Sequence, residues 1–463
     1  MTADDFYVRR AGILLHPTSL PSGVLDADAD RWLEMLSEAG FGVWQVLPLG
    51  EPQSGLSPYQ CISAFAINPA LLRKYPAAEY NTEKFRKFCA TNQWLKDYAT
   101  FRLLHRHFDT APWFNWPDKF RLRDPEALDQ LRREHAQEFL HMLWQQFVLH
   151  NRWLQIKQYA NSNGILLFGD MPLFVAHDSV DVWANPDQYL LDEKGMPTVV
   201  AGVPPDYYSS TGQRWGNPHY NWEVMQASDF AWWRQRMQNH LGMFDLVRID
   251  HFRGLEAAWM INAGCETAVD GHWEKMPGAA LLNALREDYG QLPIIAEDLG
   301  IITPEVTALR KQFHLPGMSV LQFGFDAHED NPHKPHNIET DCVVYTGTHD
   351  NNTTRGWFEG LPQDEQQYVL NTLGIDVQHS SSATSSAPGK QVVSRLVERA
   401  MDCRASLCMI PLQDILQLDS SARMNTPGTI DGNWQWSFKW RQLDNNVIGA
   451  MRQQLVLAGR LTI

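Results

Sequence analysis

Residues 246–254 read LVRIDHFRG, a short apolar run that passes directly into a cluster of charged side chains. The run Leu246–Ile249 lacks the polar–apolar alternation of a half-exposed strand, so it predicts a strand buried on both faces. Strands of this kind are typical of parallel sheets covered by helices. Seven similar runs occur along the chain, at 11–15, 43–47, 165–168, 294–296, 319–323, 343–345 and 407–410.

Helical patterns separate most of these runs. Asp30 precedes the pattern RWLEMLSEAG, which we expect to end at Gly40, and Ser228 is expected to cap the pattern FAWWRQRMQNHLG. Eight buried strands alternating with helices predict an α/β protein built as a closed (β/α)8 barrel, the TIM barrel. We therefore expect residues 1–463 to form a single barrel domain.

Two connections are too long for simple loops, with roughly 115 residues between the second and third runs and roughly 75 between the third and fourth. They predict a mostly helical inserted subdomain at about 50–125. They also predict an aromatic-rich loop subdomain at about 171–227, covering the strand ends. The residues after the eighth run number about fifty, too few for a C-terminal β-sandwich of about 100 residues.

Composition narrows the possible partners. The chain has 39 Lys and Arg against 54 Asp and Glu, a net charge of −15, which argues against nucleic acid or an anionic membrane as the main partner. No apolar run approaches the length of a membrane span or a signal segment. The six cysteines show no C-x-x-C spacing, so we expect free thiols and a cytoplasmic protein.

The charged ends of the strands are the strongest functional signal, because active sites of such barrels lie at the C-terminal ends of the strands. In an extended strand Arg248 and Asp250 point to the same side. Arg248 should then lower the pKa of Asp250 and keep it ionised, as the nucleophile of a glycosidase requires. A buried ion pair that merely closes the barrel explains the same two residues equally well.

Two further strand ends carry carboxyl groups. Glu297 follows the run PIIA, where burial should raise its pKa into the range of a general acid, while Asp298 faces away and is expected to be structural. Asp350 stands next to His349 in THDNN, a pair suited to hydrogen bonding with sugar hydroxyls or to metal binding. No zinc or calcium spacing supports a metal, and no dinucleotide-binding, P-loop or G-x-S-x-G motif is present, so no cofactor is expected.

Aromatic residues gather in the polar segment 204–222, PPDYYSSTGQRWGNPHYNW, which we expect to be a loop. They could stack on the apolar faces of sugar rings or form a small core beneath the loop. Those in the segment are Tyr207, Tyr208, Trp215, Tyr220 and Trp222. Four other tryptophans lie in helical patterns and are expected to pack in the core: Trp144, Trp153, Trp232 and Trp233.

These motifs resemble glycoside hydrolase family 77, the 4-α-glucanotransferases. The resemblance runs from residue 12 to about 436, and its longest stretches, VAHDSVDVWANP and TGQRWGNPHY, are highly specific. RIDHFRG and AEDLG also occur across the wider α-amylase clan. The other matching stretches are GILLHPTSLPSG, LPLGEPQSGLSPYQCISAFAINP, YTGTHDNN and MNTPGT.

The resemblance implies a retaining transfer of an α-1,4-glucan segment to the 4-OH of another glucan or glucose. Asp250 matches the nucleophile, Glu297 the general acid/base, and Asp350 the carboxylate that stabilises the transition state. The residues expected to bind substrate are Tyr59, Asp170, Tyr207, Tyr208, Trp215, Asn217, Arg248 and His349. The implied partners are maltooligosaccharides or amylose, acted on by a monomer or a small homo-oligomer.

Two residues depart from the family pattern: Ile67 stands where Gly is expected in AFAINP, and Ser437 follows NWQW where Arg is expected. They affect expected loop geometry and substrate preference, and not the reaction class. An α-1,4-glucan hydrolase or debranching enzyme of the same clan would use the same three carboxylates. A non-catalytic glucan-binding protein would be expected to lack one of them.

Overall fold

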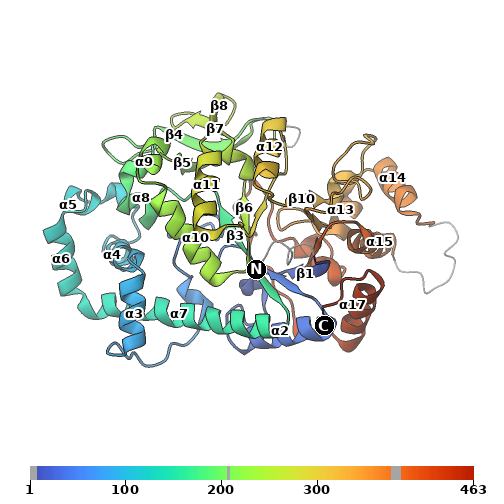
Figure 1. Cartoon of the computed structure of the whole chain (residues 1–463), viewed down its shortest axis with the longest axis horizontal. Coiled ribbons are helices and arrows are strands. Elements are labelled where there is room, and N and C mark those ends of the chain that lie inside the picture. Colours follow the sequence, from blue (N-terminus) through green and yellow to red (C-terminus); the bar gives the residue numbers. More distant parts are fainter. Residues whose placement is uncertain (1–7, 206–208, 377–386, 463) are drawn as a thin grey trace.

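The computed structural model describes residues 8–205, 209–376 and 387–462, and its centre is a barrel of eight parallel strands (Figure 1). Successive strands along the chain are neighbours around the barrel, which confirms the predicted α/β barrel. The strands are β1 (Arg10–Leu14), β2 (Val43–Gln45), β3 (Leu166–Pro172), β6 (Leu246–Asp250), β9 (Ile294–Ala296), β10 (Gly317–Val320), β11 (Cys342–Tyr345) and β12 (Leu407–Pro411).

The two end strands of the sheet order, β9 and β10, lie next to each other and complete the barrel. There the Ala296 N–H donates to the Pro316 carbonyl at 2.8 Å, and the Asp298 carboxylate accepts the Met318 N–H at 2.7 Å. Arg310 lies 3.1 Å from the same carboxylate. The expected structural role of Asp298 is therefore confirmed, because its side chain bridges the least regular joint of the barrel.

Helices surround the barrel and carry its outer apolar layer. The connection 321–341 between β10 and β11 is fully described and contains no α-helix, so the alternation of strands and helices is incomplete there. The helices are α2 (Ala27–Ala39), α3 (Glu83–Thr91), α4 (Trp94–His107), α5 (Asp118–Arg121), α6 (Pro125–Glu134), α7 (Ala136–Ser162), α8 (Val180–Ala184), α9 (Trp222–Ala227), α10 (Ala231–Met243), α11 (Gly278–Tyr289), α12 (Pro304–Gln312), α13 (Thr354–Gly360), α14 (Gln363–Leu373), α15 (Pro388–Asp402), α16 (Leu412–Ile415) and α17 (Asn445–Leu457).

Several helix ends differ from the sequence expectation. Helix α2 begins earlier than expected, because the side chain of Asp26 accepts the Asp28 N–H and acts as the cap. Its end at Gly40 is confirmed: this residue has φ 88°, and a Cβ there would lie 2.3 Å from the Leu461 side chain. Ser228 closes α9 and does not cap α10, whose preceding residue Phe230 is left-handed.

The segment 171–227 is more regular than the loop that its polar composition predicts. It contains β4 (Val199–Val203) and β5 (Gln213–Pro218), which pair with β7 (Ala257–Asn262) and β8 (Gly271–Lys275) in a second, antiparallel sheet. This sheet stands above the barrel in Figure 1. Strands β7 and β8 come from the connection after β6, so the subdomain joins segments of two connections, which sequence spacing did not reveal.

The core has two layers, one on each side of the barrel wall. Inside the barrel, Val43, Phe168, Leu246 and Met409 are among the side chains that pack together. Outside it, the helical tryptophans are buried as expected: Trp144, Trp153, Trp232 and Trp233 are each at most 6% exposed. Strands with apolar side chains on both faces explain why the runs do not alternate.

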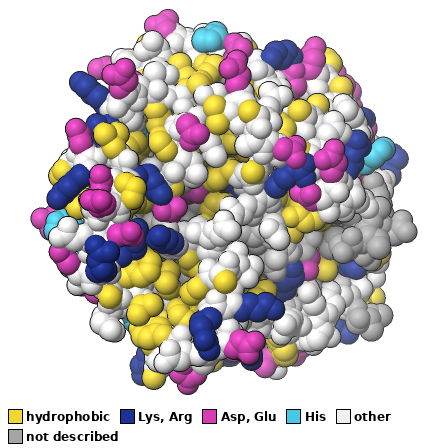
Figure 2. All heavy atoms as spheres, turned by 60° about the vertical axis from the view of Figure 1, so that its left-hand side comes forward, with side chains coloured by type: hydrophobic (Ala, Val, Ile, Leu, Met, Phe, Trp, Pro, Cys, Tyr) yellow, Lys and Arg dark blue, Asp and Glu magenta, His cyan; other side chains and the backbone are white. Residues whose placement is uncertain are grey.

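Basic and acidic side chains are mixed on the surface of the protein. In the described part of the face drawn in Figure 2, basic and acidic side chains are interspersed and do not form one continuous positive field. Within residues 8–205, 209–376 and 387–462, no helix is both long enough and apolar enough to cross a membrane. All six cysteines are free thiols.

A buried arginine ties the chain ends together at the base of the barrel. Arg460 is 0% exposed and donates five hydrogen bonds of 2.6–3.0 Å to main-chain carbonyls. The acceptors lie at the start of β1, in and just after the last turn of α15, and just before β12: Arg10, Met401, Cys403, Ala405 and Ser406.

Replacing Arg460 by Met should lower the free energy of unfolding by about 3 kcal/mol or more, because buried carbonyls lose their donors. Denaturant unfolding followed by circular dichroism measures the change. Arg452→Met is the control, since that side chain is exposed and should change stability by less than about 0.5 kcal/mol. Equal stability of the two variants would contradict the role given to Arg460.

Candidate active site

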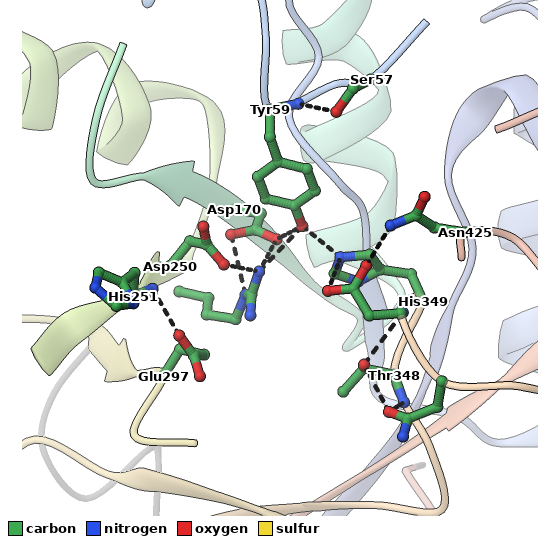
Figure 3. Close-up of polar contacts among 12 residues, drawn as sticks. Ser57, Tyr59, Asp170, Asp250, His251, Glu297, Thr348, His349 and Asn425 are labelled. Atoms are coloured by element: carbon green, nitrogen blue, oxygen red, sulfur yellow. Dashed lines mark hydrogen bonds and ion pairs between the residues drawn. The ribbon is translucent and has the colours of Figure 1, made fainter. Parts of the chain in front are cut away.

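The centre of the site is a buried guanidinium between two neighbouring strands. Arg248 on β6 is 4% exposed, and its Nε and Nη2 donate to the two carboxylate oxygens of Asp170 on β3 at 3.0 and 2.8 Å. The same Nη2 donates to Asp250 Oδ1 at 2.8 Å (Figure 3). The register places Asp170 opposite Arg248, so the pairing follows directly from the parallel ladder.

Tyr59 approaches this cluster from the long connection after β2. Its hydroxyl donates to Asp170 Oδ2 at 2.7 Å and accepts from Arg248 Nη2 at 3.0 Å. The same hydroxyl lies 2.9 Å from His349 Nε2, and the two rings stack with centroids 5.3 Å apart. Burial raises the pKa of Tyr59 well above its ordinary value, so the phenol stays protonated. These contacts bring four sequence-predicted residues together: Tyr59, Asp170, Arg248 and His349.

Glu297 follows the next strand, β9, and is held by main-chain donors. The N–H of His251 donates to its Oε2 at 2.6 Å, and the N–H of Leu299 donates to its Oε1 at 3.0 Å. His251 has φ 54°, an uncommon left-handed backbone for a residue other than glycine, which occurs here directly after Asp250. Burial raises the pKa of Glu297, and this confirms the expected direction.

The pKa of Asp250 moves opposite to the sequence expectation. Burial raises the pKa of Asp250 well above its ordinary value, and the neighbouring carboxylates of Asp170, Glu297 and Asp350 raise it further. The Arg248 guanidinium lowers it, as predicted, but loses to burial. The predicted net direction of the Asp250 pKa shift was wrong. The prediction considered only the charge of Arg248 and left out the burial of Asp250 and the other carboxylates around it. Asp250 keeps 31% of its side chain exposed, so it opens toward incoming ligand.

Asp350 stands on the loop after β11 and faces solvent, with 49% of its side chain exposed. Asn425 Nδ2 donates to its Oδ1 at 2.6 Å, and His349 Nε2 lies 3.4 Å from its Oδ2. Burial lowers the pKa of His349, so the imidazole is neutral near pH 7. Asn425 belongs to the quoted stretch MNTPGT, but no single-residue signal marked it as part of the site.

Metal binding was the alternative role for His349 and Asp350, and it would require further ligands close to these two side chains. Among the residues that the structure describes, no group of three His, Cys, Asp or Glu side chains could hold a metal ion. His349 contacts the Tyr59 hydroxyl instead, and Asp350 accepts a hydrogen bond from Asn425.

The aromatic segment divides into three groups. Tyr207 and Tyr208 lie outside the described residues. Trp215 on β5 is partly exposed and meets the His251 ring edge to face, with centroids 4.8 Å apart; His251 directly follows Asp250, and its N–H donates to Glu297. Tyr220 is 2% exposed and packs with Trp232 and Trp233, and Trp222 packs against the core from its edge; the core explanation holds for these two.

Asn217 is 4% exposed, and both ends of its amide are used within the protein. Its Nδ2 donates to the Val175 carbonyl at 2.8 Å, and its Oδ1 accepts from Gln60 Nε2 at 3.0 Å. The side chain therefore links β5 to the segment that carries Tyr59. We interpret Asn217 as a support for the site, and its predicted contact with substrate stays a prediction.

The sequence matches one protein family along most of its length. The sequence model of the family described as 4-alpha-glucanotransferase matches residues 15–77 and 72–443. The chain is 42% identical to a 4-alpha-glucanotransferase of Synechocystis sp., over 98% of both chains. It is 43% identical to one of Thermus thermophilus, over 92% of this chain and 94% of the relative.

A solved structure agrees with these sequence matches. The amylomaltase from Streptococcus agalactiae in complex with acarbose superposes with a TM-score of 0.91 at 31% identity, covering 98% of this chain and 99% of that chain. The barrel and its inserted segments are therefore shared along almost the whole length of both chains.

The electrostatics of the cluster can be tested by titration. We expect the pKa of Asp250 to lie above the ordinary aspartate value of about 3.9 and that of Glu297 above about 4.3. Asp170→Asn removes a negative charge, so the pKa of Asp250 should fall and the group should stay ionised to lower pH. Carbon-13 NMR of labelled side-chain carboxyls, assigned with Asp250→Asn and Glu297→Gln, measures both values.

The control is Asp245→Asn at the opposite end of the barrel, where the carboxylate accepts the Leu167 N–H. It should leave the pKa of Asp250 unchanged. An unchanged or higher pKa of Asp250 in Asp170→Asn would show that the buried network is not what perturbs it.

Proposed function

The chain belongs to the 4-alpha-glucanotransferase family, and we propose that Asp250, Glu297 and Asp350 carry out its reaction. The enzyme acts on α-1,4-glucans and transfers a glucan segment to an acceptor glucan. The observation that carries the residue assignment is the contact of one buried guanidinium, Arg248, with Asp250 at the end of β6, next to the strand β9 that Glu297 follows. An α-1,4-glucan hydrolase or debranching enzyme is not favoured.

In the first half-reaction, Asp250 attacks the anomeric carbon of the donor sugar. The bond to the leaving glycosidic oxygen breaks, and its electron pair takes a proton from the Glu297 carboxyl. The product is a β-linked glycosyl ester on Asp250, and the shortened glucan leaves with a free 4-OH. The raised pKa of Glu297 suits this step, because burial favours the protonated carboxyl that has to donate the proton.

In the second half-reaction, the 4-OH of the acceptor attacks the anomeric carbon of the ester. Glu297, now a carboxylate, takes the hydroxyl proton, and the electron pair of the ester bond returns to Asp250. Two inversions retain the α configuration. Glu297 begins and ends the cycle protonated, so no other proton donor is needed.

Arg248 and Asp170 prepare the nucleophile for this attack. The guanidinium donates to one oxygen of Asp250, so it orients the carboxylate and favours its ionised form against burial. Asp170 in turn holds the guanidinium by two hydrogen bonds. The arrangement leaves the second oxygen of Asp250 for the anomeric carbon.

The donor ring is held on the side opposite Glu297. Asp350 is oriented by Asn425 and lies beside a neutral His349, so its carboxylate can accept hydrogen bonds from sugar hydroxyls. Such bonds strengthen as positive charge develops on the ring. Tyr59 stacks on His349 and completes this wall.

Transfer competes with hydrolysis, so the acceptor side has to favour a sugar over water. Trp215 stands on the second sheet beside His251, where its ring can pack on an acceptor ring. Tyr207 and Tyr208 belong to the same connection and are proposed to assist it. Maltooligosaccharides and amylose are the proposed donors.

We also propose the domain division 1–463 as one catalytic barrel, with insertions at about 50–125 and 171–227, the second covering the active site. Helices α3, α4 and α5 support the helical character of the first insertion. A monomer or small homo-oligomer working in the cytoplasm, without a cofactor, is the proposed form. The free state of all six cysteines supports a reducing compartment.

The assignment is tested with maltotriose as both donor and acceptor. Asp250→Asn and Glu297→Gln should each lower the rate of disproportionation by about 10³-fold or more, because each removes a group needed in both half-reactions. Chromatography of the product ladder measures the rate. The wild-type enzyme should yield glucose and longer oligomers with almost no rise in total reducing ends.

Glu305→Gln on the exposed side of α12 is the matched control and should retain the wild-type rate. Retention of transfer by Asp250→Asn would overturn the assignment of the nucleophile. A rise in reducing ends equal to the bonds cleaved would instead overturn the proposed preference for transfer over hydrolysis.

A further inference from the structure

The loop that carries His349 and Asp350 begins and ends at buried threonines. Thr346 directly follows β11, and Thr354 is the first residue of α13; both are 0% exposed. The residues between them include Asp350, whose side chain is half in solvent. The position of Asp350 therefore depends on how firmly the two ends of this loop are held.

One carboxylate joins both ends. Asp414, in the short helix α16 after β12, is 2% exposed. Its Oδ2 accepts the hydroxyl of Thr346 at 2.6 Å and the hydroxyl of Thr354 at 2.7 Å, and its Oδ1 accepts the Thr354 N–H at 2.8 Å. In the described part of the chain, no ion pair is found for Asp414. The hydrogen bonds given above join its carboxylate to the two ends of the loop.

Gln322 supports the loop from the strand on the other side. It follows β10 and is 6% exposed; its Nε2 donates to the Asn352 carbonyl at 3.0 Å and to the Thr354 hydroxyl at 3.3 Å. A Cβ on Gly347 would lie 2.7 Å from this amide, so the loop passes close against it. The strands on both sides of β11 thus hold the same loop.

We propose that Asp414 is a positioning residue of the transfer reaction, which sets the place of Asp350 by joining Thr346 and Thr354. This inference rests on the proposed function of Asp350. A carboxylate suits the task because it accepts several hydrogen bonds at once, and an amide of the same shape has only one acceptor oxygen. With Asn at this position at least one buried donor loses its acceptor, and the loop ends separate.

The test is a double-mutant cycle with Asp350, using maltotriose disproportionation as the assay. Asp414→Asn should lower kcat by about 10- to 100-fold with KM within about threefold, because a displacement of about 1 Å at a reacting group can cost about 10²-fold. In the Asp350→Asn background the same change should lower the residual rate by less than about threefold, since the group being positioned is already impaired.

Asp245→Asn is the matched control, because this carboxylate also accepts a main-chain N–H but at the opposite end of the barrel. It should leave kcat within about twofold in both backgrounds. A second control uses the threonines: Thr346→Val and Thr354→Val should reproduce the loss seen in Asp414→Asn, while Thr346→Ser and Thr354→Ser, which keep the hydroxyl, should restore activity.

Each other outcome has a definite reading. Equal loss from Asp414→Asn with and without Asp350, or no loss at all, overturns the positioning role and leaves the proposed function of Asp350 standing. Full activity of Asp350→Asn overturns the proposed function of Asp350 itself. If Asp414→Asn does not fold, the cycle is run with the Thr346→Val and Thr354→Val double variant, and equal loss in both backgrounds overturns the inference.

Discussion

The buried charge of Arg248 is the constraint on which the arrangement of the site depends. A guanidinium removed from water is tolerated only where carboxylates and hydrogen-bond acceptors surround it, and removing one partner of such a pair typically costs about 3–5 kcal/mol. Asp170, Asp250 and Tyr59 provide those partners from two strands and one inserted segment. The contacts that neutralise the charge therefore also orient Asp250, the proposed nucleophile, so one set of contacts serves both the buried charge and the geometry of the candidate site.

The barrel brings these groups together because parallel strands end at one edge. The proposed catalytic carboxyl groups lie at the last residue of β6 and in the segments after β9 and β11, and the residues that support them lie within β3 or follow β10 and β12. These strand ends are supported by neighbours in the ladder, as Asp170 supports Arg248 and Asp414 joins Thr346 to Thr354. The side chains of Asp250 and Asp350, proposed to act on the substrate, are 31% and 49% exposed, while the supporting Asp170 and Asp414 are buried.

The core of this site was predictable from local patterns. Asp250, Glu297 and Asp350 follow short apolar runs, and a parallel barrel places such ends together whatever the connections contain. Asp298 could likewise be assigned a structural role from the alternation of side chains along a strand. Asn425 and Asp414 escaped this reasoning, because neither forms a pattern with its sequence neighbours; their partners lie 75 and 68 residues away.

The sequence by itself determined the barrel and the resemblance to a glucanotransferase family, and it marked the three carboxylates proposed for the reaction, because these depend on hydrophobic runs and on the residues that follow each run. Only the tertiary structure decided the sign of the pKa shift at Asp250, since that sum includes the desolvation of groups brought from distant segments. It also decided that the aromatic segment forms part of a second sheet, with Tyr220 in the core and Trp215 at the site. The strands within 199–218 and 257–275 pair across a long stretch of sequence. Such pairing depends on which strand edges meet in the folded protein, and no local pattern predicts it.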